Sequence, residues 1–234
     1  MKNSRKPAQK RTLKRIIDVC MTVLLLCLMA YQVTGETLHE WFGIGMTVLL
    51  IAHHILNFQW YTSLFRGKYN AFRIVTVVVN TLLLLSIGLT ALCGMSMSAH
   101  AVPFLYGLLP VSFARQLHLA MSHWSFLLMG VHLGLHLPAM TAGIRWRGKN
   151  KQILLALFFV VACCGVWLFL KSGMLNYLFF RTAFAMFDHS KAGILVFAEN
   201  FAMLVSFTFF GALCAVLMKM RRRKKHSNNS RENN

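Results

Sequence analysis

Acidic residues are scarce in this chain of 234 residues, which has 6 Asp and Glu against 25 Lys and Arg and a formal net charge of +19. Charged residues of both signs make up only 13% of the sequence, whereas hydrophobic residues make up 57%. Such an apolar composition excludes an ordinary soluble domain and is typical of a membrane protein. The basic residues lie in short segments between apolar runs, where charge sets membrane topology, so we expect no nucleic-acid partner.

Several chemical motifs are also absent. The sequence has no C-x-x-C-H, which excludes covalent attachment of a c-type haem, and it has no phosphate-binding glycine loop or H-E-x-x-H. All six cysteines fall inside or at the ends of apolar runs rather than in polar loops. We therefore expect no disulfide framework and no soluble catalytic site of these types.

Six apolar runs are each long enough to cross the roughly 30 Å hydrocarbon core of a bilayer as a helix. They cover residues 16–34, 37–60, 74–97, 113–142, 152–170 and 193–218. Since lipid offers no water to the backbone, each run must satisfy its own hydrogen bonds, as a helix does. The sequence thus predicts an all-α membrane protein with a bundle of six transmembrane helices.

The positions of Lys and Arg predict the orientation of this bundle. The two terminal tails and the loops that follow the second and fourth runs hold 21 of the 25 basic residues. Basic segments remain on the cytoplasmic side, so we expect both termini to be cytoplasmic. The first run is longer than the apolar part of a signal peptide and has no small-residue cleavage site after it, so we expect it to be retained.

Histidine is unusually frequent for such an apolar chain, with ten residues, eight of them in or beside the second, third and fourth runs. A histidine inside a bilayer is costly unless it has a partner, so this cluster suggests a functional site. His39 and His53 are 14 residues apart, and so are His118 and His132. Fourteen helical steps fall within about 40° of four full turns, so each pair shares one helix face with its members about 21 Å apart.

The second and fourth helices both run from outside to inside, so parallel packing would bring His39 to His118 and His53 to His132. Two facing imidazole pairs at two depths are what two bis-histidine haems require. The spacing therefore predicts two non-covalent b-type haems, ligated by His39 and His118 on the outer side and by His53 and His132 on the inner side.

Two other histidines are less favoured as ligands. His54 lies about 60° around the helix from His39, and His136 lies one turn beyond His132, where it could contact a haem propionate, a quinone or the inner loop. A different interpretation is that the histidines line a path for a transition metal or for protons.

Two local polar contacts are also predicted. Thr37 and Glu40 match a capping box, in which Glu40 reaches back to the start of the second helix. Asp18 follows Arg15 by three residues, so we expect an ion pair between them at the membrane interface.

Four segments resemble the bacterial flavinylation-associated cytochrome family, a former domain of unknown function. They are GETLHEWFG at 35–43, HHILN at 53–57, QLH at 116–118 and VHLGLH at 131–136, and the stretch 177–188 is similar to the outer loop of longer members. The resemblance implies a di-haem membrane b-type cytochrome that passes electrons across the bacterial cytoplasmic (inner) membrane. The paired 14-residue spacing is also similar to that of cytochrome b in quinol-oxidising complexes.

This resemblance implies partners as well as cofactors. Besides the lipid bilayer, we expect a quinone or a cytoplasmic electron donor, and a separate extracytosolic flavoprotein, because no flavinylation motif is visible here. The chain would then be an electron-transfer component rather than a stand-alone catalyst. The alternatives are a self-contained quinol or ferric reductase and the histidine-lined metal or proton transporter.

The predicted organisation has four parts. A basic cytoplasmic tail covers residues 1–15, and a four-helix haem-binding core covers 16–142. Two further transmembrane helices with an outer loop cover 143–218. The last part, 219–234, is a basic and polar cytoplasmic tail for which we expect no fixed structure.

Overall fold

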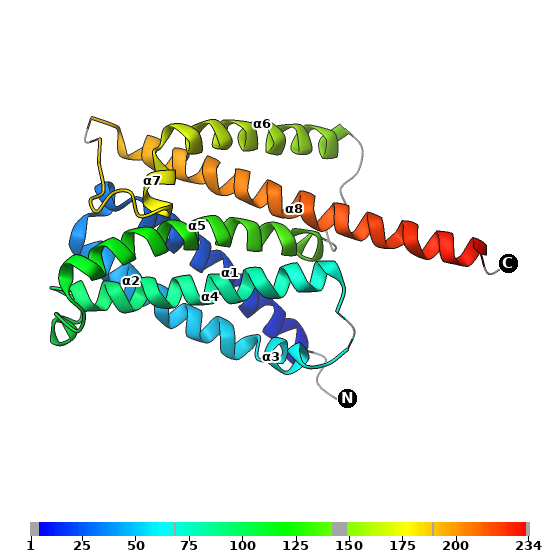
Figure 1. Ribbon diagram of the computed structural model, residues 1–234, viewed down its shortest axis with the longest axis horizontal. Coiled ribbons are helices and arrows are strands. Elements are labelled where there is room, and N and C mark those ends of the chain that lie inside the picture. Colours follow the sequence, from blue (N-terminus) through cyan, green and yellow to red (C-terminus); the bar gives the residue numbers. More distant parts are fainter. Residues whose placement is uncertain (1–4, 68, 142–148, 189, 233–234) are drawn as a thin grey trace. The chain divides into compact units, whose positions relative to one another are not determined.

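The computed structural model describes residues 5–67, 69–141, 149–188 and 190–232. Within these residues all regular structure is helical, as predicted. The long helices are α1 (Arg5–Met29), α2 (Tyr31–Leu56), α4 (Ala71–Met97), α5 (Val111–Met140), α6 (Lys149–Lys171) and α8 (Gly193–Glu232) (Figure 1). The short ones are α3 (Gln59–Leu64), the 3-10 helix η1 (Pro103–Leu105) and α7 (Met174–Leu178).

Three of these helices are long and apolar enough to cross a membrane: Ala71–Met97, Asn150–Lys171 and Gly193–Arg221. In α6 only 11% of the apolar window is buried by the protein, which leaves its hydrophobic side chains available to lipid. The protein is therefore a helical membrane protein. The other predicted runs also form helices, α1, α2 and α5, whereas Arg145 and Arg147 of the predicted inner loop lie outside the described residues.

The chain forms two compact units, each described separately below. Unit 1 comprises Met1–Gly67, Leu89–Leu119 and Ala183–Phe197. Unit 2 comprises Lys68–Gly88, Ala120–Thr182 and Ala198–Asn234. Helices α4, α5 and α8 are each divided between the two units.

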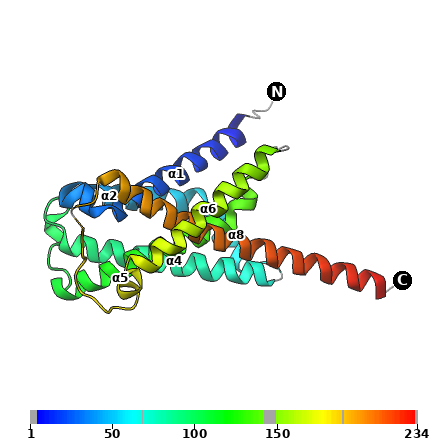
Figure 2. The same ribbon diagram turned by 90° about the horizontal axis from the view of Figure 1, so that it is seen from above.

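In unit 1, α1 and α2 pack side by side and run in opposite directions (Figures 1 and 2). The chain reverses at Ala30, which is completely buried, so α1 ends five residues earlier than the predicted run. A second break follows inside α2 at Gly35, whose φ of 70° and ψ of 175° are not helical. Glycine adopts this positive φ at little cost, so the regular part of α2 begins after it, close to the predicted start at residue 37.

In unit 2, glycines allow the helices to approach closely. A Cβ added to Gly134 of α5 would overlap the Thr208 carbonyl oxygen of α8, and one added to Gly165 of α6 would overlap the Ala202 carbonyl oxygen. Such small-residue contacts replace hydrophobic burial as the means by which membrane helices associate. Phe126 of α5 is fully buried, and its ring centroid lies 6.0 Å from that of Phe207 in α8.

Both ends of the chain are more helical than the sequence predicts. Helix α1 begins at Arg5, inside the predicted basic tail, and α8 continues to Glu232 through the tail for which no fixed structure is expected. These basic ends extend helices whose apolar parts are already formed, so each added residue requires no new nucleation.

Candidate functional site

Unit 1 brings together two of the predicted ligand residues, His39 of α2 and His118 of α5. Their ring centroids are 6.0 Å apart and their planes are inclined by 69°. Imidazole nitrogens bind metals at about 2 Å, so two rings on opposite sides of one metal ion have centroids about 6 Å apart. The predicted outer pair therefore has the spacing that a shared axial site requires.

The hydrogen bond at His118 determines which of its nitrogens can bind a metal. Nδ1 lies 2.9 Å from the main-chain oxygen of Thr90 in α4. A carbonyl oxygen only accepts, so Nδ1 carries the proton and Nε2 of the neutral ring keeps its lone pair. Gly94 makes room for this arrangement, because a Cβ there would lie 3.2 Å from Cε1 of His118.

The surroundings of His39 are apolar and aromatic. The ring of Tyr31 meets it edge-on at 5.0 Å, and Phe187 stacks on Tyr31 at 5.5 Å. Nδ1 of His39 is buried and has no hydrogen-bond partner among the described residues. An unsatisfied buried polar atom is costly, and a metal bound at this Nδ1 would offset that cost, while the ring also has a hydrogen bond to the main chain of Leu28.

His53, also in unit 1, is hydrogen-bonded to a residue of α1. Its Nδ1 lies 2.8 Å from Oδ1 of Asp18, and the two side chains are 24% and 30% exposed. The main-chain oxygen of His53 accepts a bond from Asn57, whose own side chain accepts one from Lys14. The predicted pair of Asp18 with Arg15 is therefore wrong: the carboxylate fixes a histidine ring instead.

His132 lies in unit 2, and its Nδ1 is also hydrogen-bonded to a side-chain oxygen, in this case of an amide. Its Nδ1 is 2.8 Å from Oδ1 of Asn80 in α4, and its ring centroid is 4.7 Å from that of His136. His53 and His132 belong to different units, so their pairing on an inner haem stays a prediction.

One pattern unites three of the four predicted ligands. In His53, His118 and His132, Nδ1 is bonded to an oxygen acceptor, which in the neutral ring places the lone pair on Nε2. Metal-binding histidines almost always have such a partner, because it fixes the tautomer and the ring orientation. The structure adds Asp18, Asn80 and Thr90 to the candidate site. Asp18 and Asn80 each had a sequence signal, as a polar side chain within an apolar run, whereas the main-chain oxygen of Thr90 had none.

The role predicted for Glu40 is wrong. Its carboxylate accepts bonds from the Ser98 hydroxyl at 2.7 Å and from the main-chain N–H groups of Ala99, His100 and Ala101 at 3.0, 2.8 and 2.8 Å. It therefore holds the loop after α4 rather than capping α2. An ionised carboxylate suits four donors because it only accepts hydrogen bonds.

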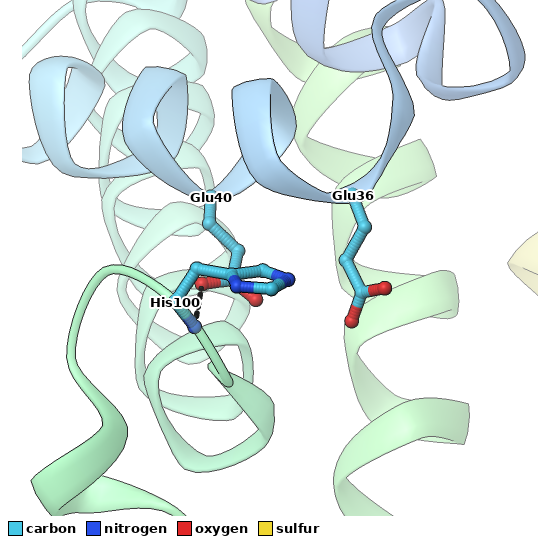
Figure 3. A group of neighbouring side chains, drawn as sticks. All are labelled: Glu36, Glu40 and His100. Carbon is cyan, nitrogen blue, oxygen red and sulfur yellow. Dashed lines mark hydrogen bonds between the residues drawn. The ribbon is translucent and has the colours of Figure 1, made fainter.

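Glu40 also belongs to a cluster with Glu36 and His100 (Figure 3). Their ligand atoms lie within 4.8 Å of one another, with His100 extending from the loop toward Glu36. Because the Glu40 carboxylate is already bonded to the loop, this cluster has a structural explanation.

Two other histidines have aromatic partners, although the ring of His54 also lies 5.6 Å from that of His53. His54 bonds through Nδ1 to the Tyr61 hydroxyl at 2.7 Å, and His123 stacks on Tyr177 at 4.6 Å. His189 lies outside the described residues.

Comparison with known proteins adds no family assignment. No family model, no curated protein and no solved structure matches this chain. The resemblance to flavinylation-associated cytochromes therefore depends on the sequence segments named above alone.

Proposed function

We propose that this chain is a membrane b-type cytochrome that binds two haems and carries electrons across the bacterial cytoplasmic membrane. The observation that carries the proposal is the approach of His39 and His118, whose ring centroids are 6.0 Å apart. The hydrogen bonds on Nδ1 of His53, His118 and His132 support it, because such bonds fix the tautomer and orientation of metal-binding histidine rings.

In this proposal His39 and His118 hold the outer haem and His53 and His132 hold the inner one. Each bound haem supplies a one-electron couple between ferric and ferrous iron. The protein orients the ligand rings through Asp18, Thr90 and Asn80. Beside the outer pair, the Tyr31 ring meets the His39 ring edge-on and Phe187 stacks on Tyr31.

The proposed topology has six membrane crossings with both termini cytoplasmic. Helices α1, α2 and α5 join the three apolar helices as spans, and the basic loops lie inside. Electrons would pass between a quinone or a cytoplasmic donor and a separate extracytosolic flavoprotein. The chain is then an electron-transfer component of an oxidoreductase system.

The test is the cofactor content of the purified protein. In detergent, a reduced-minus-oxidised spectrum should show a b-type α-band, and haem extraction should give about two haems per chain. A haem-free preparation with bound transition metal would overturn the proposal in favour of a metal transporter. Turnover of quinol with ferric iron, without any partner protein, would favour a self-contained reductase.

Single substitutions test the ligand assignment. His118→Ala should remove one haem and leave the other, whereas the matched control His100→Ala, at an exposed histidine of the outer loop, should retain both. Two haems with a normal spectrum in His118→Ala would show that the ligands are assigned wrongly.

A further inference from the structure

The three Nδ1 hydrogen-bond acceptors at the candidate ligands differ in charge. His118 bonds to a main-chain carbonyl, His132 to a side-chain amide and His53 to the carboxylate of Asp18. Only the last of these acceptors is an anion. The two proposed haems would therefore have ligands of unequal electron-donating strength.

The negative charge of Asp18 is directed at His53. Its Oδ1 lies 2.8 Å from Nδ1, within the range of a charge-assisted hydrogen bond. Lys14 lies one turn earlier on α1, but its ammonium group donates to Oδ1 of Asn57 at 2.8 Å. In the described part of the chain, His53 is the ion-pair partner of this carboxylate.

In the described residues, neither histidine of the outer pair has a hydrogen bond to a carboxylate. Glu40 neighbours His39 in the sequence, but its carboxylate is bonded to four neutral donors of the loop Ser98–Ala101, so its charge acts on His39 only through space. Nδ1 of His118 bonds to the neutral main-chain oxygen of Thr90.

We propose that Asp18 is a positioning residue that lowers the reduction potential of the haem held by His53 below that of the haem held by His39 and His118. Ferric haem carries one more positive charge than ferrous haem, so an anion on the ligand stabilises the oxidised form. The hydrogen bond also makes the imidazole a stronger donor to iron, which acts in the same direction. This inference rests on the proposed di-haem function.

The first experiment is a redox titration of the purified wild-type protein, followed by its α-band. Two components are expected, and single-ligand variants assign them. His118→Ala should leave the component of lower potential, and His132→Ala should leave the component of higher potential. The reverse order, or equal potentials, would overturn the inference.

Asp18→Asn then tests the carboxylate itself, because the amide keeps an oxygen acceptor but removes the charge. The lower potential should rise while the higher one, an internal reference, stays unchanged. Asp188→Asn is the control for charge, since its carboxylate accepts bonds from Ser190 in the segment before α8, and it should move neither component. Asn80→Asp should lower the same component that Asp18→Asn raises.

These results separate the two proposals. A wild-type protein with fewer than two haems would refute the di-haem function. Two retained haems with unchanged potentials in Asp18→Asn would refute the role of Asp18 and leave the function intact. If Asp18→Asn loses a haem on purification, the order of the two wild-type potentials decides the question.

Discussion

His53 and His54 are adjacent in α2, and their hydrogen-bond partners distinguish them. The carboxylate of Asp18 accepts a hydrogen bond from Nδ1–H of His53, which leaves Nε2 of the neutral ring with a lone pair. The Tyr61 hydroxyl beside His54 can donate as well as accept, so it does not fix that ring in the metal-binding tautomer. Under the proposed function, this difference favours His53 over His54 as the ligand, as the helical spacing does.

The Glu40 carboxylate provides a residue-scale prediction about stability. Glu40→Gln should lower the free energy of unfolding by about 2 kcal/mol, because hydrogen bonds to a charged group are worth roughly 1.5–3 kcal/mol and the donors of the loop would be left poorly paired. Thermal unfolding in detergent measures this change. The loop Ser98–Ala101 should also become more sensitive to protease.

Glu36→Gln is the matched control for this prediction. It removes the same charge one turn earlier on α2, from an exposed side chain, and should change stability by less than about 0.5 kcal/mol. Equal unfolding temperatures for the two variants would show that the bonds of Glu40 contribute nothing.

At the residue scale, the sequence predicted contacts between histidines that recur at equal spacing but not contacts of isolated residues. Each 14-residue spacing puts two histidines on one helix face, and from this we predicted that His39 meets His118, whose rings are 6.0 Å apart. Asp18 had no such signal: Arg15 was its nearest cation along α1, whereas His53 is 35 residues away. A contact made by a main-chain oxygen, such as that of Thr90, cannot be predicted from the residue type, because every residue has this oxygen.

The helix boundaries were predicted best where one residue type decides them. Gly35 interrupts α2 because it takes a positive φ, and the predicted gap between the first two runs fell there. The chain reversal at Ala30 was not predicted, because alanine favours helix and the surrounding residues are equally apolar. Packing of α1 against α2 ends the first helix, and sequence periodicity does not report that packing.

Glycine contacts between helices provide a prediction at the element scale. Gly134→Ala should destabilise unit 2 by about 1–3 kcal/mol, because the added methyl group would meet the Thr208 carbonyl oxygen and the Ala212 nitrogen, both backbone atoms. Side chains can rotate away from such a clash, but packed backbones cannot. Thermal unfolding in detergent should show the loss.

Gly45→Ala is the control for this substitution. It also adds a methyl group inside a helix, yet the new Cβ would lie 3.7 Å from Leu24, an ordinary contact. Alanine favours helix over glycine by up to about 1 kcal/mol, so this variant should be as stable as wild type or more stable. If Gly134→Ala were equally stable, the close approach of α5 and α8 would not be needed.

At the scale of the whole molecule, none of the three helices that qualify as spans by composition contains a predicted ligand. The three apolar spans are α4, α6 and α8, whereas the predicted ligands lie on α2 and α5. Each histidine lowers the apolar character of its helix, so a cofactor site obscures the membrane signal of the helices that form it. Sequence and structure therefore agree on helices but leave the number of crossings to experiment.

The two termini decide between three and six crossings. An even number of spans places both ends on one side of the membrane, and an odd number places them on opposite sides. Fluorescent-protein fusions fold inside the cytoplasm and alkaline phosphatase is active only outside it, so the two reporters identify the side of each end. We expect cytoplasmic signals at both ends and phosphatase activity for a fusion after Tyr106, which follows α4.

The segment between α6 and α8 provides a second test of whether the chain crosses the membrane three or six times. With six crossings and a cytoplasmic N-terminus it lies outside, whereas with only α4, α6 and α8 inserted it lies inside and the C-terminus lies outside. A phosphatase fusion after Ser172 should therefore be active, and activity at the C-terminus instead would show that α1, α2 and α5 do not all cross. The basic residues favour the first result, because the six-span arrangement places the loops and tails richest in Lys and Arg on the cytoplasmic side.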